Sequence, residues 1–72
     1  MKKYFLIAIY NVGQVKSCFV EARNEMIAVK MVTESMGRSM QILRIQRIKK
    51  STFLYMKRTK AREMVYSKEV WQ

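Results

Sequence analysis

The side chains that could perform catalysis are few in this sequence, and they are not arranged for it. The 72 residues include no histidine and a single cysteine, Cys18. Histidine is the commonest general base, and Cys18 has no histidine that would activate it as a nucleophile. Glu21 and Glu25 flank a predicted strand-to-helix junction, and Glu63 and Glu69 lie among cations, so no acid/base pair is evident. The sequence therefore predicts a protein that is not an enzyme and that uses no metal or cofactor.

Positive charge is the strongest signal in the composition. Fifteen lysines and arginines face five acidic residues, which gives a net charge of +10. Residues 37–72 carry ten of these cations and two glutamates, whereas residues 1–36 carry five cations and three glutamates. A half-molecule of this kind attracts nucleic acids, acidic proteins or anionic membranes. The alternative is a small domain that charge keeps soluble, but solubility alone would not concentrate the cations in one half.

Aromatic residues are interleaved with the cations of the second half. Lysine and arginine can contact phosphates while aromatic rings stack on bases, and the same residue types anchor protein interfaces. In so small a domain, any one of these rings is more often part of the core than part of an interface. The predicted binding surface consists of Arg38, Arg44, Arg47, Lys49, Lys50, Tyr55, Lys57, Arg58, Lys60 and Arg62.

Two strands and a helix are predicted to precede this surface. Residues 4–10 form an unbroken apolar run, which is typical of a strand buried on both faces. A short turn follows, and residues 14–23 alternate as a second strand, antiparallel to the first, in which Cys18 is a small buried apolar residue. Residues 25–36 have apolar side chains at helical spacing, with Asn24 as the N-cap.

Residues 40–49, "MQILRIQRIK", are predicted as a third strand. Leu43 and Ile45 are expected to face the core, and Arg44 the opposite side of the sheet. Arg47 has the core-side phase, but it lies near the end of the strand, where it would extend past the helix and join the lysines that follow. The outward face mixes apolar and cationic residues, which is more typical of an interface than of a solvated surface.

Two further strands are predicted in the remaining sequence. Residues 52–58 are expected as a fourth strand after a short turn. Beyond residue 59 the pattern favours a fifth strand that pairs back on residues 53–57, with a short helix as the alternative. Residues 1–72 are thus expected to form a single α+β domain of about five antiparallel strands, in the order β-β-α-β-β-β. One helix would cover part of one face and leave the other to solvent or a partner.

The segments "FVEARNEMIAVK" (19–30), "LRIQRI" (43–48) and "FLYMK" (53–57) support a resemblance. In length and expected element order the chain resembles small phage-encoded anti-CRISPR proteins, particularly inhibitors of type I-F surveillance complexes. The resemblance implies a non-enzymatic inhibitor that occupies the nucleic-acid path of a CRISPR effector complex or another host nucleoprotein. Because the chain is basic, it cannot act by mimicking DNA. The alternatives are a DNA- or RNA-binding accessory protein and an inhibitor of another host nucleic-acid machine.

The expected location is the cytoplasm, without a membrane partner. The apolar run at residues 4–10 is short for a signal peptide and is followed by no small-residue cleavage site. No run approaches the ~20 apolar residues that a membrane span requires. The chain is expected as a monomer, or as a homodimer that pairs through an unpaired edge strand.

Overall fold

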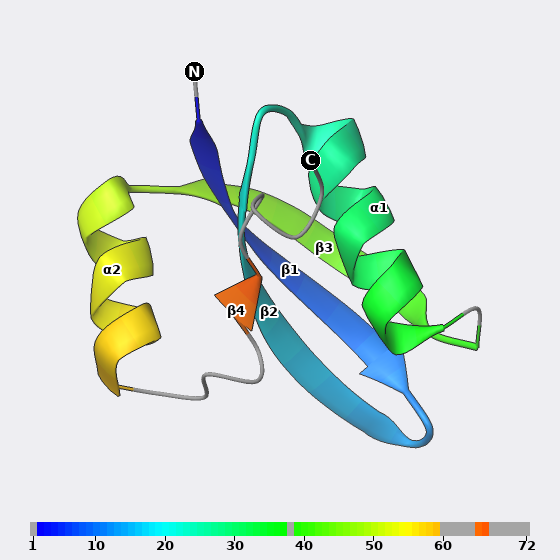
Figure 1. The fold of residues 1–72 in the computed structure, drawn as a ribbon. Coiled ribbons are helices and arrows are strands. Elements are labelled where there is room, and N and C mark those ends of the chain that lie inside the picture. The colour runs from blue at the N-terminus through cyan, green and yellow to red at the C-terminus, as the bar shows by residue number, and fades with distance from the viewer. Residues whose placement is uncertain (1, 38, 60–64, 67–72) are drawn as a thin grey trace.

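The middle of the protein is a long antiparallel hairpin (Figure 1). The computed structural model describes residues 2–37, 39–59 and 65–66. Strand β1 (Lys3–Asn11) pairs along its whole length with β2 (Gln14–Ala22), which confirms both predicted strands and their antiparallel arrangement.

The turn of this hairpin contains two residues, Val12 and Gly13, and both have a positive φ. Two-residue hairpin loops with this geometry match the twist of the flanking strands, and asparagine or glycine usually occupies them. Val12 has φ 50° and is 83% exposed, so a β-branched residue occupies a backbone conformation that it rarely adopts.

Helix α1 (Glu25–Met36) begins and ends as its sequence predicts. The side-chain oxygen of Asn24 accepts a hydrogen bond of 2.9 Å from the backbone N–H of Ile27. At the other end, Gly37 has φ 89°, and its backbone N–H donates to the carbonyl of Thr33 at 2.8 Å. The apolar stripe of the helix packs on the sheet through the fully buried Ala28, Met31 and Val32.

Strand β3 (Gln41–Ile48) pairs antiparallel with the other side of β1. The register shifts within this pair, because Ile9 lies opposite Ile42 whereas Ala8 lies opposite Arg44. Leu43 is the extra residue of this β-bulge and is 51% exposed, so its predicted place in the core is wrong. The bulge lets Ile42 and Ile45 lie on the same, core-facing side of the sheet.

Residues 50–59 form a second helix, α2 (Lys50–Thr59), where the sequence predicted a fourth strand. Its first backbone hydrogen bond joins the N–H of Phe53 to the carbonyl of Lys49 at 3.1 Å. Phe53 is buried and Met56 half-buried, whereas Leu54 and Tyr55 between them are exposed. A spacing of three is helical. The sequence does not show this spacing, because a run of consecutive apolar residues is compatible with a strand as well as with a helix.

The last described element is a two-residue strand, β4 (Val65–Tyr66). It pairs parallel with Phe19–Val20 of β2, so a strand is present in this region but it does not pair with residues 53–57. The observed order is β-β-α-β-α-β, and the sheet order is β3-β1-β2-β4. The described part of the chain therefore has four strands, of which three form the antiparallel sheet, and two helices instead of one.

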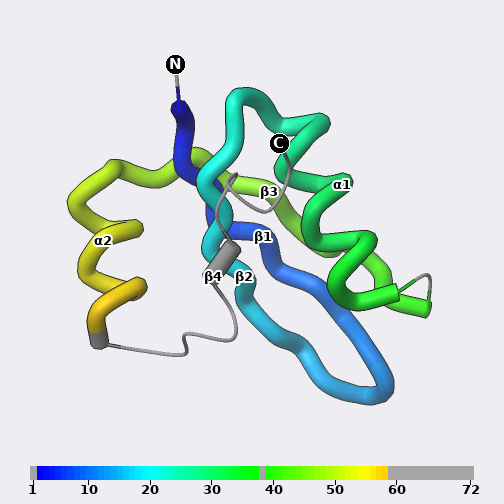
Figure 2. Tube along the Cα trace, in the orientation of Figure 1, coloured from blue at the N-terminus to red at the C-terminus, as the bar shows by residue number. Residues whose placement is uncertain are grey.

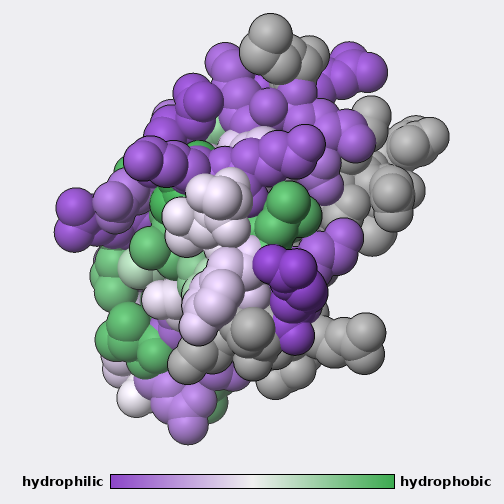
Figure 3. Space-filling model, turned by 90° about the vertical axis from the view of Figure 1, so that its left-hand side faces the viewer, coloured by the Kyte–Doolittle hydropathy of each residue, from purple (hydrophilic) through white to green (hydrophobic). Residues whose placement is uncertain are grey.

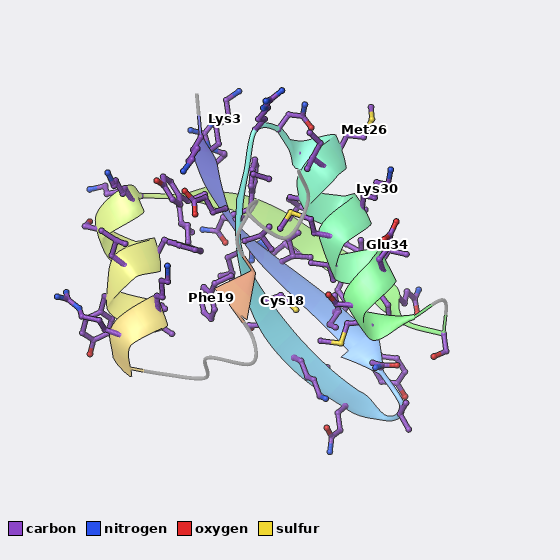
Figure 4. The ribbon with its side chains drawn as sticks, viewed as in Figure 1. Lys3, Cys18, Phe19, Met26, Lys30 and Glu34 are labelled. Atoms are coloured by element: carbon purple, nitrogen blue, oxygen red, sulfur yellow. The ribbon has the colours of Figure 1, made fainter. Side chains whose placement is uncertain are left out.

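The two helices cover opposite faces of this sheet (Figure 2). Adjacent residues of a strand point to opposite faces. In β2, Cys18 lies on the α1 side and Phe19 on the α2 side (Figure 4). On the α2 face, the ring of Tyr4 contacts that of Phe53 with centroids 5.0 Å apart. The core cluster fills the α1 face and consists of Phe5, Ile7, Ile9, Cys18, Val20, Ala22, Ala28, Met31 and Val32.

Candidate functional site

The pairing of the strands brings three cationic segments to one end of the sheet. Lys3 at the start of β1 lies opposite Ala22 of β2, so Arg23 follows directly beside it. On the other side, Tyr4 lies opposite Ile48 of β3, which places Lys49 next to Lys3. Neighbouring strands lie about 4.8 Å apart, so three chain segments present their cations within a width of roughly 10 Å.

We refer to this group as the cationic end. Figure 3 shows hydrophilic side chains gathered over the upper part of the molecule, where β1 and α2 begin. All of its members except the half-buried Lys3 are exposed, and only Glu21 and Glu25 oppose them nearby in the chain. Lys2 pairs with Glu21 at 3.3 Å. The cationic end consists of Lys2, Lys3, Arg23, Arg47, Lys49 and Lys50.

Arg47 is held in place by an aromatic ring. It lies opposite Phe5 in the register, on the α1 face, and its guanidinium carbon is 5.8 Å from the centroid of that ring. A cation above an aromatic face is attracted by the ring's quadrupole. The contact keeps Arg47 beside the sheet while its side chain stays exposed. As predicted, this arginine has the core-side phase and lies near the lysines that follow β3.

Lys49 and Lys50 occupy an unfavourable position for cations. They stand at the N-terminus of α2, where unpaired backbone N–H groups carry partial positive charge. No acidic residue lies in the first turn of this helix, whereas Lys57 and Arg58 in its last turn are well placed for the dipole. The two lysines repel the positive end of the helix dipole, and a bound anion would reduce this repulsion.

Four of the other predicted site residues lie outside the cationic end. Arg44 is exposed opposite Ala8, and it therefore lies on the face of the sheet opposite to Arg47. Tyr55 is 55% exposed on α2, and Lys57 and Arg58 lie in the last turn of that helix, away from its cationic start. Arg38, Lys60 and Arg62 fall outside the described residues.

Three cations of the site were missed by the sequence reasoning, namely Lys2, Lys3 and Arg23. They belong to the half of the chain with the smaller charge excess, so composition did not point to them. The predicted hairpin already placed Arg23 near the start of β1. Only the pairing of β3 with β1, which the sequence did not reveal, adds the lysines at residues 49 and 50 to the same end.

The described residues offer no evident reactive group. Cys18 is fully buried, and burial raises the pKa of its thiol to about 11, which leaves it protonated and a poor nucleophile at neutral pH. Within residues 2–37, 39–59 and 65–66, no three histidine, cysteine or acidic side chains are grouped to hold a metal ion. Neither of the helices described has the length and apolar character to cross a membrane.

Comparison with known proteins finds no family model, curated protein or solved structure that matches this chain.

Proposed function

We propose that this protein binds the phosphate backbone of a nucleic acid through the cationic end, without catalysis. The observation that carries the proposal is the convergence of cations from the starts of β1 and α2 and from the ends of β2 and β3. Lysine and arginine side chains that neutralise phosphates release condensed counterions, and this release drives binding in a salt-dependent manner.

The side chains of the cationic end are suited to contact phosphates and not to stack on bases. Within residues 2–37 and 39–58, the exposed aromatic side chains are Tyr10 and Tyr55, and neither belongs to the cationic end. Tyr10 lies next to the hairpin turn, at the opposite end of β1 from Lys3. Phosphate contacts position a protein on a nucleic acid but carry no sequence information. The proposed binding is therefore tolerant of sequence.

The test is a fluorescence anisotropy titration of short labelled duplexes and single strands at several salt concentrations. Neutralising four or five phosphates gives a slope of log K against log salt of roughly −3.5 to −4.5 on duplex DNA. Replacing Lys49 and Lys50 by glutamine is expected to reduce this slope by about two. The absence of binding to every probe at low salt would refute the proposal.

A matched control separates the site from the charge of the whole protein. The double replacement Lys16→Gln and Lys30→Gln removes the same charge from the turn end of β2 and from the outer face of α1. It is expected to leave the salt slope unchanged. Equal losses in both double variants would mean that net charge alone binds the probe and that the cationic end is not a site.

Inhibition of a CRISPR effector is a narrower form of the same proposal. The element order of the chain is not the β-β-α-β-β-β order on which the resemblance rested, so this narrower proposal is supported by charge alone. It requires co-elution with a purified effector and loss of target-DNA binding by that effector. The Lys49 and Lys50 double variant should lose both effects, and indifference of the effector to the wild-type protein would exclude this form.

A further inference from the structure

Strand β3 is less covered than β1 and β2. It forms one edge, with β1 on its inner side, and no described residue pairs with its outer side. Both helices pack mainly on β1 and β2. None of the residues of β3 is fully buried, and Ile42, Ile45 and Ile48 are only half-buried. An exposed strand edge of this kind is a template for another strand.

The regular part of this edge is short. The bulge at Leu43 interrupts the ladder, which leaves residues 44–48 as its straight segment. Within that segment, Arg44 and Ile48 point to the α2 face, since they lie opposite Ala8 and Tyr4. Ile45 and Arg47 point to the α1 face. Each face of the edge therefore offers one arginine and one half-covered isoleucine.

A second copy of this chain is a poor occupant for the edge. Each copy has a net charge of +10, and pairing two β3 strands would place the Arg44 and Arg47 of both copies along one short ladder. Like charges on facing strands oppose pairing, whereas opposite charges stabilise it. The two arginines and the bulge thus disfavour pairing between the β3 strands of two copies. The arginines attract a strand of the opposite charge.

We infer that the edge of β3 binds an extended acidic segment of another protein by strand addition along residues 44–48. Residues that face one another across two strands point to the same face, so the acids opposite Arg44 and Arg47 are three positions apart. In an antiparallel partner, the positions opposite residues 48, 47, 45 and 44 would be apolar, acidic, apolar and acidic. The apolar pair would cover the flanks of Ile48 and Ile45.

The test uses a synthetic peptide with blocked termini. It consists of threonine and valine and contains two glutamates three positions apart, each preceded by valine. Peptide is titrated into isotopically labelled protein, and chemical shifts and amide exchange are followed by NMR. Shifts and new amide protection are expected in β3. Methylating two peptide amides that would pair removes two hydrogen bonds, and it should weaken binding on the order of ten-fold at unchanged charge.

Protein variants separate this surface from the proposed nucleic-acid site. Arg44→Gln lies outside the cationic end and should weaken peptide binding while it leaves DNA binding intact. Arg47→Gln changes a residue that both surfaces share and should weaken both, whereas Lys30→Gln on α1 should weaken neither. The Lys49 and Lys50 double variant should keep peptide binding while it loses DNA binding, so either activity can fail alone. Equal binding of the methylated peptide, or of a peptide with adjacent glutamates, would overturn the inference. So would association of two copies of the chain through β3.

Discussion

The two faces of the sheet differ in how completely they are covered. On the α1 face, Ile7, Ile9 and Val20 are fully excluded from solvent, and three helix residues close over them. On the α2 face, Phe53 is the one fully buried residue among residues 50–58 of the helix, and Leu54 beside it is 41% exposed. Along residues 2–37 and 39–59, the burial that stabilises the fold lies mostly on one face.

This difference separates stability from recognition. A chain of this size has only about 4–11 kcal/mol of net stability, and the α1 face supplies most of the apolar burial behind it. The α2 face is attached through fewer contacts, and α2 begins with two cations of the proposed site. Substitutions on the first face should therefore lower the free energy of unfolding of the whole protein. Substitutions on the second should release a helix and weaken binding before they unfold the sheet.

The largest effect is expected from Ile7→Ala on the α1 face. Removing this fully buried side chain from the central strand should lower the free energy of unfolding by about 2–5 kcal/mol, because it leaves a cavity among packed neighbours. Chemical denaturation measures the change. Val15→Ala, at a position 67% exposed on β2, is the matched control and should change stability by about 0.5 kcal/mol or less. Similar losses in both variants would contradict the assignment of the core.

Phe53→Ala should have a smaller effect on global stability, about 1–3 kcal/mol, although a buried phenylalanine usually contributes more. The expected reason is that α2 undocks locally and loses the contact with Tyr4 while β1 stays folded. Amide hydrogen exchange should show faster exchange in residues 53–59 and little change in Ile7 and Ile9. Uniformly faster exchange in both regions would mean that the two faces unfold as one unit.

Cys18 gives the α1 face a stability that depends on pH. The thiol has a pKa near 9 in the unfolded chain and about 11 in the folded one, so the folded state favours the protonated form. Its contribution is complete below pH 9 and is lost as the pH rises toward 11, on the order of 1 kcal/mol at pH 10. Urea denaturation at pH 7 and pH 10 measures it. Cys18→Val should lack this part of the pH dependence, and the same slope in both proteins would contradict it.

The smallest effect is expected at the hairpin turn, which belongs to neither face. Val12→Asn should stabilise the protein by about 0.5–1 kcal/mol, because asparagine tolerates the positive φ that valine resists. A rise of a few degrees in Tm, with unchanged nucleic-acid affinity, is the expected result. Val12→Thr keeps the branched side chain and should give no such gain. A destabilised asparagine variant would show that the turn is not strained.

The elements with clear periodicity could be predicted from the sequence. The bounds of α1 match because Asn24 and Gly37 mark its ends and its apolar stripe has one period. The hairpin was also predicted correctly, because turn residues separate two β-rich runs. The strand predicted for residues 52–58 was wrong, since Phe53, Leu54, Tyr55 and Met56 are all apolar or aromatic and only tertiary contacts decide which of them are buried.

The candidate site was predicted in part. Arg47 has the core-side phase and lies near Lys49 and Lys50, and Arg44 lies on the opposite face of the sheet, both as predicted. Arg44 is therefore not part of the cationic end, although the predicted binding surface grouped it with the others. The sequence could not show that Lys3 joins them, because that depends on β3 pairing with β1 across residues that are distant in the chain. Charge counted along the sequence locates a cationic half. Only strand pairing locates a cationic surface.

The bulge at Leu43 has a consequence for the solubility of the protein at high concentration. It limits the number of residues of β3 with which another strand can pair along the open edge. Deleting Leu43 would restore uninterrupted alternation from Ile42 to Ile48 and give a longer, straighter edge. Such edges seed aggregation, so the shortened chain should precipitate at lower concentration than the wild type, even where its fold is intact. The one extra residue of the bulge is thereby expected to raise the concentration at which the protein stays in solution.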